Sequence, residues 1–333
     1  MSQLSVSIVI PCHNSAATIG ETIEACLAQD FSGQIEVIVV DDGSTDQTAM
    51  IVAKYPEVRL LYQSNKGPAA ARNRGWRAAS GSIVCFTDSD CVPNPCWVTR
   101  LVAAYNDHQI GGVGGSYSLL NPDSLLASCI HQEIIYRHRR MSKQAVFLGS
   151  YNASFRRRVL EEVGGFDETY KMASAEDNAL SYRVIRLGYR LIFDVHNTVG
   201  HYHPVSLRKY LVRQFWHGYW RVKLYRDHPG MMRGDGYSGI RDFVQPPLYL
   251  LMLICLPFIW LPAGLYTVAS LLAAGMLMQV DLVYFACRQT GDWKHLILAP
   301  IIIIRGIARG FGMLWGIVHF CLASRSLPFV GRR

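Results

Sequence analysis

Two carboxylates that follow a short apolar run are the clearest sign of chemistry in this sequence. Asp88 and Asp90 come directly after residues 83–87, a stretch of apolar and β-branched residues that is typical of a buried strand. Because side chains alternate along an extended segment, both carboxylates point to the same side, just beyond the carboxyl end of the strand. Open α/β sheets bind ligands at that edge. Two hard oxygen donors there suit a divalent cation that carries a phosphate-bearing substrate. A polar turn after a strand is the alternative interpretation.

Polar residues also follow two other predicted strands. The pair His13 and Asn14 follows a strand predicted over residues 5–10, and the pair Asp41 and Asp42 follows one over residues 35–40. A further strand is predicted at 59–62 and a helix at 68–79. Alternating strands and helices with continuous apolar strands predict a doubly wound, mostly parallel α/β sheet with helices on both faces. The carboxyl ends of parallel strands share one edge, so we expect three separated polar clusters to build one site.

The sequence offers no glycine loop that would cradle phosphates. Residues 111–115 are rich in glycine, but they lack the G-x-G-x-x-G spacing and no helix-forming run follows them. A G-x-x-x-x-G-K-[ST] loop is also missing from the sequence. We therefore expect phosphates to be held by a metal ion and basic side chains.

The composition changes abruptly near the carboxyl end, which predicts a catalytic domain over residues 1–230 and a membrane-associated region over residues 231–333. Residues 248–286 contain Asp281 as their one charge, and 296–322 contain only Arg305 and Arg309. About 20 apolar residues cross a bilayer, so residues 246–287 could hold two spans joined by a turn at 260–264. Arg305 and Arg309 lie on one helical face, so the last helix either crosses or lies in the interface. The alternative is a buried helical hairpin of a soluble protein.

Charge and cysteine usage predict where the chain acts. The amino terminus carries no secretory signal, and the formal net charge is +8. Basic residues before the first apolar segment indicate a cytoplasmic catalytic domain at the inner (plasma) membrane, because cytoplasmic flanks are enriched in Lys and Arg. No recognition motif for nucleic acid accompanies the positive charge. Nine cysteines without zinc-site spacing indicate reduced thiols. The basic residues are Arg208, Lys209, Arg213, Arg221, Lys223, Arg226, Arg233 and Arg241.

The middle of the chain adds a third acidic site. Apolar residues at Leu180, Val184 and Leu187 follow a helical period and predict a helix over residues 174–187. Glu176 and Asp177 then lie in its first turn. The same residues fit the capping-box pattern S-x-x-[DE], which would give Asp177 a purely structural role.

Together these segments resemble glycosyltransferase family 2, whose members have the GT-A fold. The resemblance covers about residues 5–195, and five motifs occur in the family's order. His13 stands where the family often has Tyr, and Ser15 where it often has an acid. The matching segments are residues 9–14, 39–46, 65–67 with 71–73, 88–90 and 176–177.

The resemblance implies a role for each matching residue in binding the nucleotide-sugar donor. Asp42 and Asp41 would accept hydrogen bonds from the base and ribose, with the backbone at Pro11 and its neighbours His13 and Asn14 against the base. Arg72 and Lys66 would neutralise the diphosphate or hold the base. Asp88 would contact the ribose or the metal's water shell. The alternative for the Asp41–Asp42 pair is a helix N-terminus complemented by negative charge.

The resemblance also implies the cofactor and the catalytic base. Asp90, with Asp88, would bind Mg²⁺ or Mn²⁺, and Asp177 would take the proton from the acceptor hydroxyl in a single, inverting displacement. Glu176 and His201 are candidates for contacts with acceptor or diphosphate, and a histidine there could also complete the metal site. Gln214 is a further candidate for contact with acceptor or diphosphate, because its segment resembles, out of register, the Q-x-x-R-W segment of processive members.

We therefore expect a membrane-attached, metal-dependent, inverting hexosyltransferase (EC 2.4). Its partners would be a nucleotide-sugar donor, a lipid-linked or saccharide acceptor in envelope or exopolysaccharide assembly, and the membrane. A processive polysaccharide synthase is one alternative. A non-catalytic, membrane-anchored nucleotide-sugar-binding protein is the other. A nucleotidyltransferase of similar fold would need a glycine-rich amino-terminal loop, which residues 10–14 do not provide.

Overall fold

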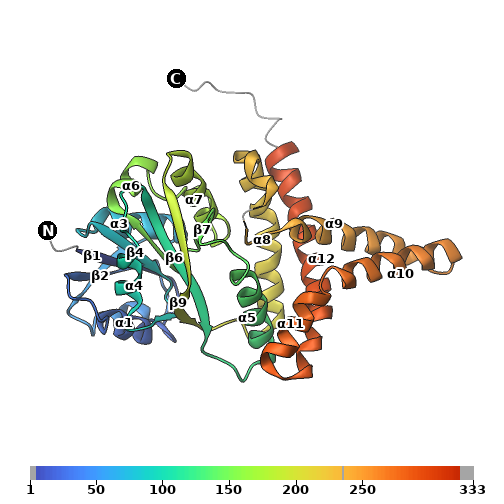
Figure 1. Ribbon diagram of the computed structural model, residues 1–333, viewed down its shortest axis with the longest axis horizontal. Coiled ribbons are helices and arrows are strands. Elements are labelled where there is room, and N and C mark those ends of the chain that lie inside the picture. The colour runs from blue at the N-terminus through green and yellow to red at the C-terminus, as the bar shows by residue number, and fades with distance from the viewer. Residues whose placement is uncertain (1–4, 235, 323–333) are drawn as a thin grey trace. The chain divides into compact units, whose positions relative to one another are not determined.

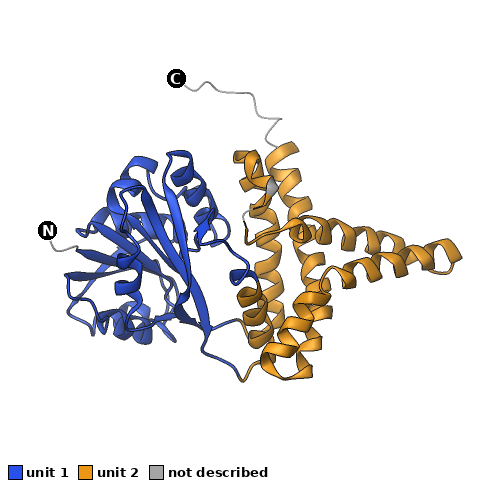
Figure 2. Cartoon of the chain, viewed as in Figure 1, with its two compact units in different colours: residues 1–122, 137–203 blue, residues 123–136, 204–333 orange. Residues whose placement is uncertain are grey.

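The computed structural model describes residues 5–234 and 236–322. The chain divides into two compact units, shown in different colours in Figure 2. Unit 1 comprises residues 1–122 and 137–203, and unit 2 comprises residues 123–136 and 204–333. The division thus lies earlier than residue 230, because residues 204–230 and the short segment 123–136 pack with the carboxyl-terminal helices.

Unit 1 is built on one sheet, with nine strands among the described residues (Figure 1). The order is β3-β2-β1-β4-β8-β6-β9-β5, and β7 pairs with β9. Strands β1 to β4 are parallel neighbours, as predicted, whereas β8 runs antiparallel between β4 and β6 and makes the second half mixed. The strands are β1 Val6–Cys12, β2 Ile35–Asp42, β3 Val58–Gln63, β4 Ile83–Thr87, β5 Cys91–Pro93, β6 Ile110–Leu119, β7 Gln144–Ala145, β8 Asn152–Arg156 and β9 Arg190–His201.

Both faces of this sheet are buried, which explains why its central strands are apolar throughout. Alternate residues of β1 point to opposite sides: Ile8 and Ile10 pack against α1, α2 and α4, and Val9 packs against α3, α6 and α7. The predicted three-layer α/β architecture is therefore confirmed. The helices of unit 1 are α1 Ile19–Leu27, α2 Thr48–Val52, α3 Pro68–Ala78, α4 Trp97–Ala103, α6 Arg157–Val163 and α7 Glu176–Arg186.

Helix α3 begins where the sequence predicts and positions one buried cation of the site. Gly67 precedes it with φ 94°, and Pro68 occupies the first helical turn. A Cβ built on Gly67 would lie 2.7 Å from the carbonyl oxygen of Lys171, so the chain passes close to a second loop here. The helix therefore starts at a fixed point beside residues 164–175.

Unit 2 is helical, and two of its segments are long and apolar enough to cross a membrane among the residues described. These are Ile240–Phe258 and Trp293–Leu322; α10 and α11 satisfy the same criterion only as a pair bent by 46°. Helices α9 and α10 form the predicted hairpin, with its turn between residues 258 and 262. The elements are α5 Leu125–His138, α8 Leu207–Asp227, η1 Pro229–Arg233, α9 Ile240–Cys255, η2 Leu256–Phe258, α10 Pro262–Leu277, α11 Val280–Thr290, η3 Trp293–Ile297, α12 Leu298–Gly316 and η4 Ile317–Leu322.

Candidate active site

The polar clusters that follow β1, β2 and β4 meet at one edge of the sheet, as the sequence predicts. The His13 ring nitrogen Nδ1 lies 2.9 Å from the carbonyl oxygen of Asp42, which joins the ends of β1 and β2. The Ser15 and Ser89 hydroxyls are 2.7 Å apart, which joins the segments after β1 and β4. Three separated stretches of sequence therefore build one surface because parallel neighbours end together.

Asp42 holds the loop that follows β3. Its Oδ1 accepts hydrogen bonds from the Lys66 backbone N–H at 2.8 Å and the Gln63 side chain at 2.7 Å, and its Oδ2 accepts one from the Gly67 N–H at 2.8 Å. The side chain is 4% exposed. Three internal donors already surround this carboxylate, so direct contact with a nucleotide stays a prediction. Asp41 is likewise buried, and its Oδ1 accepts from the Ser44 N–H at 2.8 Å.

The exposed residues beside this loop are better placed to face a ligand. Asn14 has φ 52°, a left-handed conformation that asparagine tolerates. Its N–H donates to Ser44 Oγ at 2.9 Å, which fixes the turn after β1. Asn65 Nδ2 lies 3.2 Å from His13 Nε2. His13, Asn14 and Lys66 are exposed, whereas Pro11 contributes buried backbone in β1.

Arg72 joins two of the predicted acidic sites from inside the protein. One terminal nitrogen donates to Asp88 Oδ1 at 2.7 Å and the other to Glu176 Oε1 at 2.8 Å. Arg72 is 2% exposed, so its predicted contact with the diphosphate or the base stays a prediction. It holds Asp88, whose side chain remains 32% exposed. The neighbouring carboxylates raise the pKa of Arg72 against the effect of its burial.

Glu176 is part of the same buried network, and its predicted contact with acceptor or diphosphate stays a prediction. It is 2% exposed; besides the Arg72 bond, its Oε2 accepts from the Ser174 N–H at 2.7 Å. Both carboxylate oxygens are thus used inside the protein. Glu176 is the first residue of α7, where a negative charge also complements the helix dipole.

Asp177 follows Glu176 directly, but its side chain is half-buried and its pKa is raised. Withdrawal from water and the adjacent Glu176 charge raise the pKa of Asp177 to about 7, against the opposing effects of Arg72 and of backbone N–H groups at Asn178 and Ser150. The capping-box alternative does not hold, because the N-cap of α7 is Ala175 and no side chain caps it. Ala175 has φ 102°, a strained value for a residue with a Cβ.

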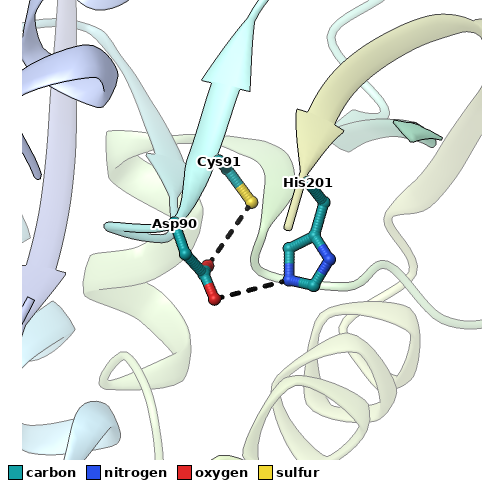
Figure 3. Close-up of side chains that lie close together, drawn as sticks. All are labelled: Asp90, Cys91 and His201. Atoms are coloured by element: carbon teal, nitrogen blue, oxygen red, sulfur yellow. Dashed lines mark hydrogen bonds and ion pairs between the residues drawn. The ribbon is translucent and has the colours of Figure 1, made fainter. Parts of the chain in front are cut away.

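A second cluster combines Asp90 with two residues of neighbouring strands (Figure 3). Asp90 Oδ2 lies 3.5 Å from His201 Nε2, and Asp90 Oδ1 lies 3.9 Å from Cys91 Sγ. One ligand atom from each of the three residues lies within 4.8 Å of the others. The imidazole and the carboxylate are suitable donors for a divalent cation. Burial and the nearby Asp90 and Asp88 charges raise the pKa of the Cys91 thiol well above its usual value, so the carboxylate and the imidazole are the stronger candidates for ligands.

The orientation of His201 is set by His203, which follows β9, and by Tyr117 of β6. Its Nδ1 lies 3.0 Å from His203 Nδ1, which leaves Nε2 directed at Asp90. The Tyr117 ring packs against it with centroids 4.7 Å apart. Such outer partners hold a metal-binding histidine in place. The metal role predicted for Asp88 stays a prediction, because this cluster forms around Asp90 and the Asp88 Oδ1 is used by Arg72.

Sequence reasoning missed two members of this surface. Asn65 was part of a matched motif without a role. His203, by contrast, belongs to the histidine segment at residues 201–203 for which a metal or diphosphate role was predicted, and it lies just beyond the end of β9. Nothing in the sequence distinguishes Cys91 from the other cysteines. Gln214, by contrast, lies in unit 2, where its Oε1 accepts a hydrogen bond from Arg309 at 2.7 Å; its predicted ligand contact stays untested.

Comparison with known proteins identifies the family. The model of the family described as "Glycosyl transferase family 2" matches residues 7–164. Glycosyltransferase AglE of Haloferax volcanii is 30% identical over 218 residues, which cover 63% of this chain and 70% of that protein. The chain belongs to glycosyltransferase family 2. Probable glycosyltransferase YdaM of Bacillus subtilis is 32% identical over 206 residues, covering 56% of this chain but only 48% of YdaM.

A solved structure shares the fold of this family 2 glycosyltransferase. A mannosyltransferase from Pyrobaculum calidifontis superposes with a TM-score of 0.60 and 22% identity, covering 95% of this chain and 88% of that one. The predicted GT-A fold is therefore confirmed. The chain spans about half the length of YdaM.

Proposed function

We propose that this chain transfers a sugar from a nucleoside diphosphate donor to an acceptor hydroxyl, with inversion at the anomeric carbon. The observation that carries the proposal is the pair of acidic residues tied together through Arg72. Arg72 holds Asp88 on one side and Glu176 on the other, next to Asp177. A donor-site carboxylate and a candidate base are thus linked through one buried cation.

Asp177 would act as the general base. Its raised pKa of about 7 places the carboxyl where it can accept a proton near neutral pH and hold it through the transfer. A single displacement needs one such base, which removes the hydroxyl proton of the acceptor as its oxygen attacks the anomeric carbon and the nucleoside diphosphate leaves. The strained backbone at Ala175 fixes the first turn of α7 in the required position.

The donor would lie along the carboxyl edge of β1 to β4. His13, Asn14 and Lys66 supply exposed polar groups there, while Asp41 and Asp42 keep the two supporting loops in place. Asp90 and His201 would hold Mn²⁺ or Mg²⁺ near the diphosphate. When bound, this cation would screen the charge that develops on the leaving group. The imidazole donor favours Mn²⁺, and the Pyrobaculum mannosyltransferase was solved with GDP-mannose and Mn²⁺.

The acceptor would be a lipid-linked or membrane-bound saccharide, reached from the cytoplasmic face of the inner membrane. The apolar helices of unit 2 support this part of the proposal because they would keep the enzyme at a lipid surface.

Nucleoside diphosphate release by the purified full chain tests the reaction. Detergent-solubilised protein is assayed with a panel of nucleotide sugars, with Mn²⁺, Mg²⁺ or chelator, and with a lipid extract. Release with one donor that depends on metal and is lost in Asp177→Asn would support the proposal. Glu57→Gln, an exposed acidic residue of unit 1, is the matched control and should retain activity. Donor binding without release in every condition would favour a non-catalytic binder. A ladder of long products would favour a processive synthase.

A further inference from the structure

Unit 2 carries an apolar hairpin that packs on α12 near Tyr249 and is exposed towards its tip. From Phe243 to Val280 the sequence contains no Asp, Glu, Lys, Arg or His. Helices α9 and α10 lie side by side, and Gly275 lets α10 approach the ring of Tyr249, since a Cβ there would lie 2.5 Å from that ring. Figure 2 shows the hairpin projecting sideways from α8 and α12. At its tip Trp260 is 82% and Phe258 55% exposed.

The turn of this hairpin has the composition of a buried segment. Turns that face water are rich in Gly, Asn, Asp and Ser, but residues 256–262 read Leu-Pro-Phe-Ile-Trp-Leu-Pro. The Ile259 N–H donates to the Leu256 carbonyl at 3.3 Å, and the Leu261 N–H donates to the Phe258 carbonyl at 3.0 Å. The two prolines have no N–H to satisfy. Backbone groups need internal partners in hydrocarbon, so this turn suits the interior of a bilayer.

Helix α9 with η2 meets the length criterion for a span only when its polar first turn is counted, and its apolar part alone is too short to carry the tip of the hairpin across a bilayer. The first part of α9 is polar, with Arg241, Asp242 and Gln245, so its apolar part runs from Pro246 to Phe258. At about 1.5 Å per residue this part is about 20 Å long. The hydrocarbon core is about 30 Å thick. The tip would therefore end inside the core and not reach the far headgroups.

Helix α12 passes a span criterion by composition, but its packing opposes a crossing. Its two arginines are paired inside unit 2: Arg305 with Glu133, and Arg309 with Asp242 at 3.0 Å. Helix α8 packs closely along it, since a Cβ on Gly312 would lie 1.9 Å from the carbonyl oxygen of Phe215. Lipid cannot surround α12 while α8 covers it, and α8 is too polar to cross with it. The charged residues of α8 are Arg208, Lys209, Arg213, Arg221, Lys223, Arg226 and Asp227.

The opposite face of α12 and η4 is apolar and exposed. Ile304, Phe311, Trp315 and Val318 are 42–54% exposed and recur every three to seven residues along one side. A helix with one apolar and one polar side suits the membrane interface. Figure 1 shows that α9 and α10 run across α12 and not along it. If the hairpin enters the bilayer along its normal, α12 lies in the membrane plane.

We infer that unit 2 enters a bilayer from one side only. The α9–α10 hairpin ends within the hydrocarbon, α12 lies in the interface with its apolar stripe towards the lipid, and the chain does not cross between residues 240 and 322. The partner is the lipid bilayer itself, and the basic side of α8 suits anionic headgroups. This inference concerns unit 2 and does not depend on the reaction of unit 1.

Depth measurement with single spin labels on the full chain tests this topology. Six of the nine cysteines are buried, so the background replaces only Cys96, Cys255 and Cys321 by Ala. Labels are placed at Trp260→Cys in the tip and Ile304→Cys in mid-α12. Gln289→Cys, at the exposed end of α11, is the aqueous reference. The protein is reconstituted in vesicles with anionic lipid, and collision rates with oxygen and a water-soluble nickel complex are compared. A far-UV circular dichroism spectrum and a thermal unfolding transition like those of the wild type identify variants that fold.

The expected result is an ordered series of depths. Position 260 should lose collisions with the nickel complex and gain collisions with oxygen, position 304 should be shallow, and position 289 should be open to water. If α12 crosses instead, position 304 becomes the deepest of the three and the inference fails. Nickel access at position 260 would overturn it as well, since the tip would then be on the far side or outside the bilayer.

Discussion

Replacing Asp177 by Asn should abolish transfer and yet stabilise the protein, because the ionised carboxylate is held away from water. The raised pKa, about 7 against an ordinary value of 3.8, means that the folded state binds the proton more tightly than the unfolded chain. Stability then falls as the pH rises from about 4 to about 7. One pKa unit corresponds to about 1.4 kcal/mol, so full ionisation costs at most about 4 kcal/mol, and water access to the half-buried carboxyl reduces this to about 2 kcal/mol.

Thermal unfolding in detergent at two pH values measures this cost. At pH 5 the carboxyl is protonated in the folded protein but ionised in the unfolded chain, so about a third of the cost is already present and Asp177→Asn should gain only about 1–2 °C. At pH 8 the variant should gain about 4 °C, on the basis of about 2 kcal/mol in a chain of this size. Transfer should fall by about 10²–10⁴-fold at both pH values, as expected for loss of a general base. In the wild type, kcat/KM should rise with pH and reach a plateau above about 7.

Three outcomes would refute this reasoning. A variant that is less stable than wild type at pH 8 would mean that the ionised carboxylate is a net stabilising partner of Arg72. Turnover that survives in Asp177→Asn, with Glu57→Gln unchanged as control, would mean that another group accepts the proton. A pH profile without an acidic limb near 7 would contradict the raised pKa directly.

Other contacts lead to further predictions. Arg72→Met should lower the free energy of unfolding by about 3–5 kcal/mol in a denaturant titration, because it leaves two carboxylates without their cation, and Arg72→Lys should lose less. His201→Gln should raise the Mn²⁺ concentration needed for half-maximal activity by at least about 10-fold. Cys91→Ala should leave that concentration unchanged. An equal rise in both variants would mean that the Cys91 thiol is also a ligand. Gly312→Ala should lower the free energy of unfolding by about 1–3 kcal/mol, and with it the melting temperature, because the added Cβ would meet the Phe215 carbonyl of α8. Gly230→Ala is the control: its Cβ would meet nothing within 4 Å, so the melting temperature should not change.

The fold of unit 1 was largely predictable because its strands bury both faces. Continuous apolar runs such as residues 83–87 coincide with β4, and the pairing of β1 to β4 follows from their parallel connections. The mixed second half was not predictable, since β8 pairs with both β4 and β6 across long stretches of chain. The division between the units was also missed, because the polar helix α8 packs on α12 through glycines that composition does not reveal.

The residues of the site were easier to predict than the direction in which they face. Local sequence identified Asp42 and Arg72 as polar groups at strand and helix ends. Whether such a group is exposed depends on partners far away in the chain: Asp42 is covered by the loop at residues 63–67, and Arg72 by Asp88 and Glu176. Both residues therefore hold other groups in place, a role that no local pattern distinguishes from ligand binding.

Glu176 and Asp177 show how the fold assigns different tasks to adjacent carboxylates. Consecutive residues of a helix point about 100° apart, so only one of the two can face Arg72. That residue is Glu176, which donors at Arg72 and Ser174 hold inside the protein. Its fixed negative charge then lies beside Asp177 and contributes to the rise in that residue's pKa. Ala175, which directly precedes these two residues, has φ 102°, a left-handed conformation that strains a residue with a Cβ. Ala175→Gly would remove that constraint, and we expect it to cost activity while stability changes by less than about 1 kcal/mol.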